Sequence, residues 1–397
     1  MKKIFFFDAW YSKFSAFLIG FVVLLSYCHL GDSTIFYKGV RYVSLAISTL
    51  IIIIYVFNNK YSMFTIQLLI YSLILALASF IGNESTIWNF VNMYYRIIAI
   101  TLYLDYGLKR YNKNIIKSFY WIFFILVSIN FFTIIKYPNG WYTSELYTNN
   151  WFFEYDNTHI FMYMPAILFS FLNTKINNKI TKITNFILFI EITYSVYYCF
   201  SANSVVAYTL LLSYFILKCI LNKFEILNAR NYFFTYIGIF FGIIIFRIQD
   251  IFSWLIVRVL GKTLTFSNRT YIWDRVIKLI KNKWILGYGQ EPVTITISKL
   301  GNAHFTHAHN TILDVIYKCG ILGLVAHLIL LILSVKELYE SRYNEISKAI
   351  SAIIFCMFIM MIFEARQEKI GLYIVFVSAY HIKDIIKEKM IERNVKV

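Results

Sequence analysis

Three histidines lie close together in one short segment, His304, His307 and His309, and Asn310 follows them directly. A long apolar run begins at the next residue, so this segment is expected at the edge of a membrane. An imidazole can take a proton from a hydroxyl group near neutral pH, and ionisable groups at a membrane boundary suggest function by default. Alternatively, His309 only caps the following helix, as Asn310 can. The residue types alone leave both interpretations open.

The same three histidines also suggest a metal site. A catalytic zinc ion usually has three protein ligands and a supporting shell of carboxylates. No HExxH pattern is present, and no close Asp or Glu partner accompanies the histidines. We therefore expect chemistry that needs neither a metal ion nor another cofactor.

Two further segments contain residues suited to close contacts. Arg269 has a planar guanidinium group that can bind a phosphate, and Gly287 and Gly289 lie in a turn whose backbone can approach a ligand or another helix. After the histidines, Gly320 and Gly323 offer a small-residue face for helix packing. Taken alone, these segments favour a plainer interpretation, in which Arg269 is a surface cation and Gly287 and Gly289 form a simple turn.

The elements that must position these residues are predicted by composition. Of the 397 residues, 59% are apolar or aromatic and 15% are charged, against roughly 45–50% and about 25% in soluble domains. Runs long enough to span a membrane, which takes about 20 residues, predict an all-α polytopic membrane protein with about 12 transmembrane helices. The predicted spans are 14–30, 40–57, 64–81, 88–106, 115–135, 159–173, 183–200, 204–221, 232–246, 311–334, 347–363 and 370–382.

Positive charge predicts the orientation of these spans. The chain has 38 Lys+Arg against 21 Asp+Glu, a formal charge of +17, and Lys and Arg accumulate in cytoplasmic loops. With the N-terminus inside, 22 of them fall in inner segments and five in short outer segments. Both termini are therefore predicted to be cytoplasmic, with most positive charge serving topology and anionic lipid headgroups. No motif supports binding of nucleic acid.

Residues 247–308 form the only long loop, which lies on the outer face in this orientation. It carries nine positive charges, which is permitted because long loops cross the membrane regardless of charge. Apolar and charged side chains from Tyr271 to Lys281 are spaced as in an amphipathic helix lying on the membrane. The loop can form a roof over an outer site, or its charges can be no more than solvated helix surfaces.

Together these features resemble the O-antigen ligase and O-antigen polymerase superfamily of bacterial envelope glycosyltransferases. The signature H-N-x9-G-x-x-G is matched, and residues 185–365 resemble the family's core region within a single membrane domain of residues 1–397. The residues that carry the resemblance are His309, Asn310, Gly320 and Gly323, with Arg269, Trp273, Gly287, Tyr288 and Gly289 upstream.

The resemblance implies a GT-C-like helical bundle in the bacterial plasma membrane that transfers a glycan from undecaprenyl diphosphate to a sugar hydroxyl at the outer face. His309 then activates the acceptor hydroxyl, and Arg269 binds the diphosphate leaving group, where neutralising the developing charge is the electrostatic part of catalysis. Gly320 and Gly323 form the structural motif. The other residues expected around the substrate are His307, Asn310, Arg247, Arg366, Trp273, Gly287 and Gly289.

Two departures from the family pattern concern charge. Members often carry a Ser-Arg pair near an earlier span, whereas residues 201–204 contain no Arg, so a second diphosphate ligand is missing there. Arg247 and Arg366, at outer ends of predicted spans, are candidates to replace it. Lys318 stands where an acidic residue often precedes the first signature glycine.

Three functions stay open at this stage. We prefer a polymerase that joins lipid-linked repeat units into an O-antigen, capsule or exopolysaccharide chain. A ligase that moves a finished glycan to lipid A core or protein shares the signature. A transporter of the lipid-linked oligosaccharide is less favoured because no internal repeat is evident. The expected partners are the lipid-linked oligosaccharide, membrane lipids, and a chain-length regulator and flippase of the same pathway.

Overall fold

A computed structural model describes most of the chain. His304 lies outside the described residues, as do Lys262 of the long loop and six of the lysines counted for the orientation: Lys2, Lys3, Lys60, Lys175, Lys223 and Lys396. The described residues are 9–31, 34–58, 61–82, 87–144, 147–173, 179–221, 224–248, 251, 253–259, 268–301 and 305–394.

Long helices make up nearly all of the described chain. The first group is α2 (Lys13–Leu25), α3 (Ile35–Asn58), α4 (Met63–Ile81), α5 (Ile87–Arg110) and α6 (Asn112–Lys136). A short hairpin of β1 (Asn150–Trp151) and β2 (Glu154–Tyr155) leads into α7 (Asp156–Leu172), α8 (Lys179–Cys199), α9 (Ala202–Leu221) and α10 (Ala229–Ile239), which continues as the π-helix η1 (Phe240–Ile245). The last part contains η3 (Trp254–Val259), α11 (Arg269–Asn282), α12 (Val293–Leu300), α13 (Thr311–Glu340), α14 (Glu345–Phe363), α15 (Ile370–Tyr380) and α16 (Ile382–Asn394).

The all-helical class predicted from composition is confirmed, since each of the twelve predicted spans falls on a helix. Five helices in the described chain, α3, α4, α6, α13 and α14, are long and apolar enough to cross a membrane. Shorter apolar helices are α2, α9, α10 with η1, and α15. The protein is therefore a multi-pass membrane protein, and the count of twelve spans stays a prediction.

The outer surface of α8 shows how these helices meet lipid. Phe186, Phe189 and Ile190 are between 46% and 64% exposed, whereas Leu188 and Ile192 are buried against the bundle. A soluble protein rarely exposes so continuous an apolar surface. In a bilayer this face needs no protein partner, because hydrocarbon is its solvent.

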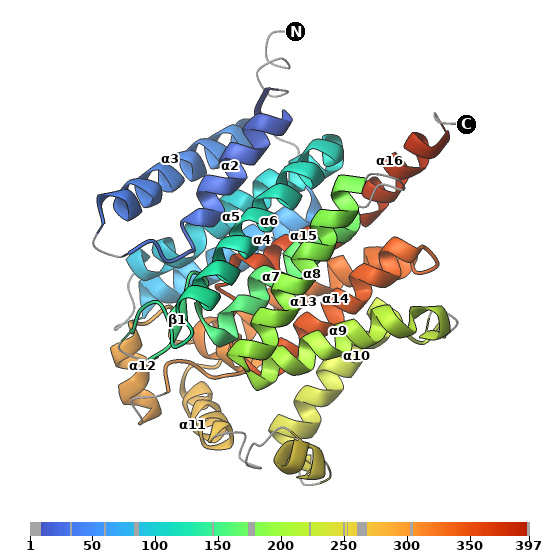
Figure 1. The fold of residues 1–397 in the computed structure, drawn as a ribbon. Helices are drawn as coiled ribbons and strands as arrows, with labels where there is room; N and C mark the ends of the chain where they lie inside the picture. The colour runs from blue at the N-terminus through green and yellow to red at the C-terminus, as the bar shows by residue number, and fades with distance from the viewer. Residues whose placement is uncertain are drawn as a thin grey trace.

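Helix α13 is central to the arrangement that positions the site. It packs against α4, α14 and α15, and it also contacts α10 and α11. Helices α11 and α12 and the β1–β2 hairpin lie together at one side of the bundle, whereas α16 and the beginning of α2 lie at the opposite side (Figure 1). This separation agrees with the predicted placement of the 247–308 loop on the face away from the termini.

The amphipathic helix predicted in that loop is present as α11. Its apolar side chains Ile272, Trp273 and Val276 are buried, and the helix contacts α13. The expectation that this apolar face lies on the membrane is therefore corrected, because the protein itself covers it. Tyr271, on another face of the helix, is 63% exposed.

Candidate active site

His309 immediately precedes α13, and its neighbour Asn310 caps that helix. The Asn310 Oδ1 accepts a hydrogen bond from the backbone N–H of Leu313 at 2.9 Å, while its Nδ2 donates to the Ile362 carbonyl at 2.9 Å. An N-cap side chain satisfies a backbone donor that the helix cannot. Because Asn310 does this, the imidazole of His309 is not occupied in capping.

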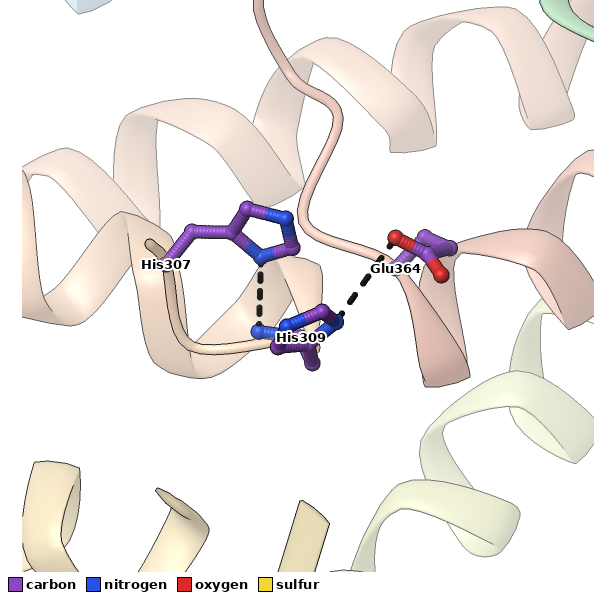
Figure 2. Close-up of side chains that lie close together, drawn as sticks. All are labelled: His307, His309 and Glu364. Carbon is purple, nitrogen blue, oxygen red and sulfur yellow. Dashed lines mark hydrogen bonds and ion pairs between the residues drawn. The ribbon is translucent and has the colours of Figure 1, made fainter. Parts of the chain in front are cut away.

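Glu364 contacts the other residues of the site, and it is not among the residues identified from the sequence. It follows the last residue of α14, its side chain is fully buried, and its Oε2 lies 3.8 Å from the Nδ1 of His309. Figure 2 shows His307, His309 and Glu364 converging from two loops. The expectation that no acidic partner stands near the histidines is therefore wrong, because this partner comes from a distant segment.

Two arginines contact the same carboxylate. Arg269 is the first residue of α11, and its Nη2 lies 2.8 Å from Glu364 Oε1. The Nε of Arg366 lies 3.5 Å from Glu364 Oε2. The Arg366 side chain is 9% exposed, is 3.5 Å from Glu368 and lies over the Tyr155 ring at 5.1 Å. The structure thus joins Arg269, His309 and Arg366, which were identified separately from the sequence.

A charged run in the sequence could have revealed Glu364. Glu364, Arg366 and Glu368 stand within five residues between two apolar spans. Charges at a membrane boundary are expensive unless they are paired or functional. Arg366 is a candidate diphosphate ligand because it lies at the outer end of a predicted span, and its acidic neighbours share that position.

His307 supports the backbone at His309. The Nδ1 of His307 accepts a hydrogen bond from the His309 backbone N–H at 3.0 Å, and the two rings are 3.9 Å apart. His309 has a φ of +48°, in the left-handed region that non-glycine residues rarely adopt. Such strained residues persist only where surrounding contacts fix them, and they cluster at functional sites.

Burial controls the protonation of these groups. Burial, with Lys318, Arg269 and Lys369 nearby, lowers the pKa of His307 to about 3, and burial, His307 and Arg269 lower the pKa of His309 well below its ordinary value. Both imidazoles are therefore neutral at physiological pH. Burial raises the pKa of Glu364 to about 7, against the opposing effect of Arg269.

The donors His307, His309 and Glu364 lie within 4.8 Å of one another, a spacing that a metal ion could bridge. However, the guanidinium groups of Arg269 and Arg366 approach the same carboxylate. Two fixed cations so close to the donor set oppose the binding of a divalent cation and favour an anion. The donor set therefore fits a metal ion poorly.

The two glycine motifs meet each other. Helix α13 is interrupted at Gly320, whose φ of +63° and ψ of −166° are not helical. The turn before α12 packs into this interruption, where the backbone N–H groups of Tyr288 and Gly289 donate to the carbonyls of Tyr317 and Lys318, both at 2.8 Å. The turn at Gly287 and Gly289 thus approaches a helix, which is one of the two alternatives that the sequence left open.

This contact requires glycine. A Cβ on Gly320 would lie 2.0 Å from the carbonyl oxygen of Ile285, and one on Gly287 would lie 2.5 Å from a backbone oxygen of α13. A Cβ on Gly323 would lie 2.0 Å from the Cβ of Cys319 in the same helix, so the close approach there is within α13 rather than to a neighbouring helix. A role of Gly287 and Gly289 in binding substrate stays a prediction.

Arg247 and Trp273 form a separate group. Trp273 is fully buried, and the Arg247 guanidinium lies over its ring at 5.3 Å. Arg247 is also paired with Asp274 at 2.5 Å and donates to the Thr270 carbonyl. Among the described residues, the contacts of Arg247 are with α11 rather than with Glu364, so Arg366 is the second cation that the structure brings to the site.

The arrangement can perform one kind of chemistry well. A neutral imidazole can accept a proton, a buried carboxylate beside it can stabilise the resulting cation, and two guanidinium groups can bind an anionic leaving group. Fold and site thus define a multi-pass membrane protein in which a histidine, a buried carboxylate and two arginines lie together beside the beginnings of α11 and α13 and the end of α14.

Comparison with known families agrees with this class. Residues 186–328 match the model of the O-antigen ligase family, which confirms the resemblance to the O-antigen ligase and polymerase superfamily. Members of this family are glycosyl-transferring enzymes of envelope polysaccharide assembly. The matched region contains Arg269, His309, Gly320 and Gly323 but ends before Glu364. No curated protein matches the chain.

Proposed function

We propose that the protein polymerises oligosaccharide repeat units carried on undecaprenyl diphosphate, at the outer face of the plasma membrane and without a metal ion. The observation that carries this proposal is the convergence of His309, Arg269 and Arg366 on the buried carboxylate of Glu364. This cluster combines a proton acceptor with a diphosphate-binding pair, which are the two groups that glycosyl transfer from a lipid diphosphate requires.

The first step is activation of the acceptor. The Nε2 of His309 accepts the proton of the acceptor hydroxyl as the hydroxyl oxygen forms its bond to the anomeric carbon of the donor sugar. The carbon–oxygen bond between that sugar and the diphosphate breaks at the same centre, and the bonding electrons leave with the lipid diphosphate. Proton removal makes the oxygen a better nucleophile as the new bond forms.

Glu364 completes the base. Once His309 has accepted a proton at Nε2, its Nδ1–H faces the Glu364 carboxylate, 3.8 Å away in the structure. Distances of this kind shorten when substrate binds, since catalytic hydrogen bonds are often long without it. A buried carboxylate fixes the orientation of an imidazole and stabilises its protonated form.

The arginines act on the leaving group. Arg269 keeps one nitrogen on Glu364, and its side chain is 20% exposed, so its remaining donors are available to a phosphate. Arg366 provides a second guanidinium on the other oxygen of Glu364. Charge develops on the diphosphate in the transition state, and preorganised donors stabilise it there.

Ligase-type transfer to lipid A core or protein uses the same chemistry with a different acceptor. The family match supports this alternative equally, since its model describes O-antigen ligase. Transport of the lipid-linked oligosaccharide is disfavoured because no internal repeat is evident in the sequence.

The distinguishing experiment uses the full chain in lipid nanodiscs with chemically defined undecaprenyl-diphosphate repeat units. Longer glycans on the lipid, seen by gel or mass spectrometry, support a polymerase, whereas transfer only to an added lipid A core supports a ligase. The His309→Ala variant should make neither product. Movement of intact donor across a vesicle membrane, unaffected by His309→Ala, would instead support transport.

A further inference from the structure

Asp314 is a buried carboxylate one turn into α13 that the proposed chemistry does not use. It is 1% exposed and accepts contacts from three different segments. Its Oδ1 accepts a hydrogen bond at 3.0 Å from the backbone N–H of Ala308, the residue before His309. Its Oδ2 accepts a hydrogen bond from the Nε2 of Gln367 and is paired with Lys318 Nζ at 2.7 Å.

Asp314 therefore connects the two loops that form the site. The Ala308 contact holds the loop that carries His309, and the Gln367 contact holds the loop that carries Glu364 and Arg366. One of these hydrogen bonds reaches the residue next to His309, and the other reaches the 364–367 segment.

Other residues at the beginning of α13 reinforce the second connection only. Asn310 donates to the Ile362 carbonyl at 2.9 Å, and the Thr311 hydroxyl donates to the Glu364 carbonyl at 2.8 Å. Both fix the backbone of the 362–367 segment to the helix. Asp314 adds the contact to the histidine loop, where the left-handed backbone of His309 must be held against relaxation.

The charge of Asp314 is balanced within the same helix. Lys318 is four residues later, its side chain is 14% exposed, and the pair places two opposite charges against each other in the protein interior. A buried carboxylate is costly without such a partner. Lys318, which departs from the family pattern, thus stabilises the buried carboxylate of Asp314.

We infer that Asp314, paired with Lys318, is the positioning residue that sets the distance between His309 and Glu364 by holding both of their loops. The inference rests on the proposed function, because it concerns the geometry of the proposed base. Asp314 touches neither the acceptor nor the donor in this role, and it acts only through the two loops.

The test reverses the hydrogen bond between Gln367 and Asp314, so that the donor and the acceptor change places. In Asp314→Asn, an amide nitrogen replaces Oδ2, so Lys318 loses its charge partner. Gln367 can then bond to this residue only by turning its own amide over, and a neutral hydrogen bond replaces a charge-assisted one, which weakens the contact to the second loop. Since a displacement of about 1 Å can cost about 100-fold in rate, we expect kcat to fall about 100-fold with little change in donor binding. The double variant Asp314→Asn/Gln367→Glu restores an N–H to carboxylate bond in the reverse direction and should recover most of this loss.

The matched control is Asp105→Asn. Asp105 is 3% exposed and is hydrogen-bonded to His381, Ser62, Thr65 and Tyr55, away from the site. This change should lower the melting temperature of the purified protein without lowering kcat per folded molecule. A general effect of removing a buried carboxylate would lower kcat in both variants and would overturn the inference.

Gln367→Met provides a second variant if Asp314→Asn does not fold, because it leaves Asp314 paired with Lys318 and bonded to Ala308. It should also lower kcat, and unchanged kcat in this variant would overturn the inference, as would a folded double variant that recovers nothing. A fully active His309→Ala protein would contradict the proposed function instead. Loss of activity in His309→Ala with normal activity in Asp314→Asn would contradict only the positioning role.

Discussion

Two histidine–carboxylate pairs, His309 with Glu364 and His381 with Asp105, lie at opposite ends of α15. Helix α15 separates them, since Glu364 precedes it and His381 follows it. At the second pair, the Nε2 of His381 lies 2.8 Å from Asp105 Oδ1. At the first, the Nδ1 of His309 lies 3.8 Å from Glu364 Oε2 without a hydrogen bond.

Hydrogen bonding distinguishes the two pairs. Both oxygens of Asp105 accept hydroxyl donors, from Ser62 at 2.6 Å, Thr65 at 2.7 Å and Tyr55 at 2.5 Å, and His381 also contacts Asp384 at 2.9 Å. These contacts satisfy the buried carboxylate and lock it in place.

The site pair is left incomplete. Among the described residues, Glu364 Oε2, His309 Nδ1 and His307 Nε2 have no hydrogen-bond partner. A buried polar group without a partner costs about 1–3 kcal/mol. In the described part of the chain, neither Asp105 nor His381 has such an atom, which suggests that the His381 pair holds helices together and that the His309 pair keeps atoms available for proton transfer.

The largest expected effect contrasts the two histidines directly. His309→Gln removes the proposed base and should lower kcat by about 10²–10⁴-fold, the usual contribution of general base catalysis. His381→Gln keeps an N–H donor beside Asp105 and should change thermal stability rather than turnover per folded molecule. Measuring kcat and the melting temperature of both variants in nanodiscs tests the contrast. Equal loss of kcat in both would remove the distinction between the two pairs.

The next largest effect concerns the leaving group. Arg269→Ala should cost about 2.7–4 kcal/mol of transition-state stabilisation, or about 10²–10³-fold in turnover, by analogy with removing one donor to a developing anion. Arg275→Ala is the matched control, because Arg275 is an exposed arginine on the same helix that contacts the Lys299 carbonyl. A loss of less than about ten-fold for Arg269→Ala would argue against a diphosphate role.

The fold was predictable from the sequence to a large extent, because each span must supply enough apolar length to cross the bilayer. His309 and Arg269 were named from the sequence through the family resemblance, and the structure places both beside Glu364, while their roles stay predictions. Glu364 was not named, because its role depends on a tertiary contact between loops far apart in the chain. For the same reason, nothing in the spacing indicated that the turn at Gly287 packs against the helix break at Gly320.

The pH dependence of turnover sharpens the comparison further. The pKa of Glu364 is raised to about 7, mainly by burial, and its ionised form stabilises a protonated His309 far better than its neutral form does. Turnover should therefore fall as pH drops through about 7, toward ten-fold per pH unit for loss of one ionised group. The lowered pKa of His309 keeps its imidazole neutral across this range, so it adds no decline there.

Glu364→Gln separates these two groups. The amide does not titrate, so the decline below pH 7 should disappear, although turnover at pH 8 should be lower than in the unaltered protein. Rate measurements from pH 5.5 to 8.5 on both proteins check this. A decline near pH 7 that persists in Glu364→Gln would assign it to another group.

The smallest expected effect is that of metal removal. A chelator such as EDTA should leave turnover unchanged, because Arg269 and Arg366 already place positive charge on the carboxylate that a metal would need. Without that charge, the donor atoms of His307, His309 and Glu364 are close enough together to bind a metal ion. Arg366→Gln reduces that charge, so this variant should bind Zn²⁺ more tightly than the unaltered protein in a competition titration. If EDTA abolished turnover and Zn²⁺ restored it, the cluster would be a metal centre, and the contrast with the His381 pair would be one between a metal site and a structural ion pair.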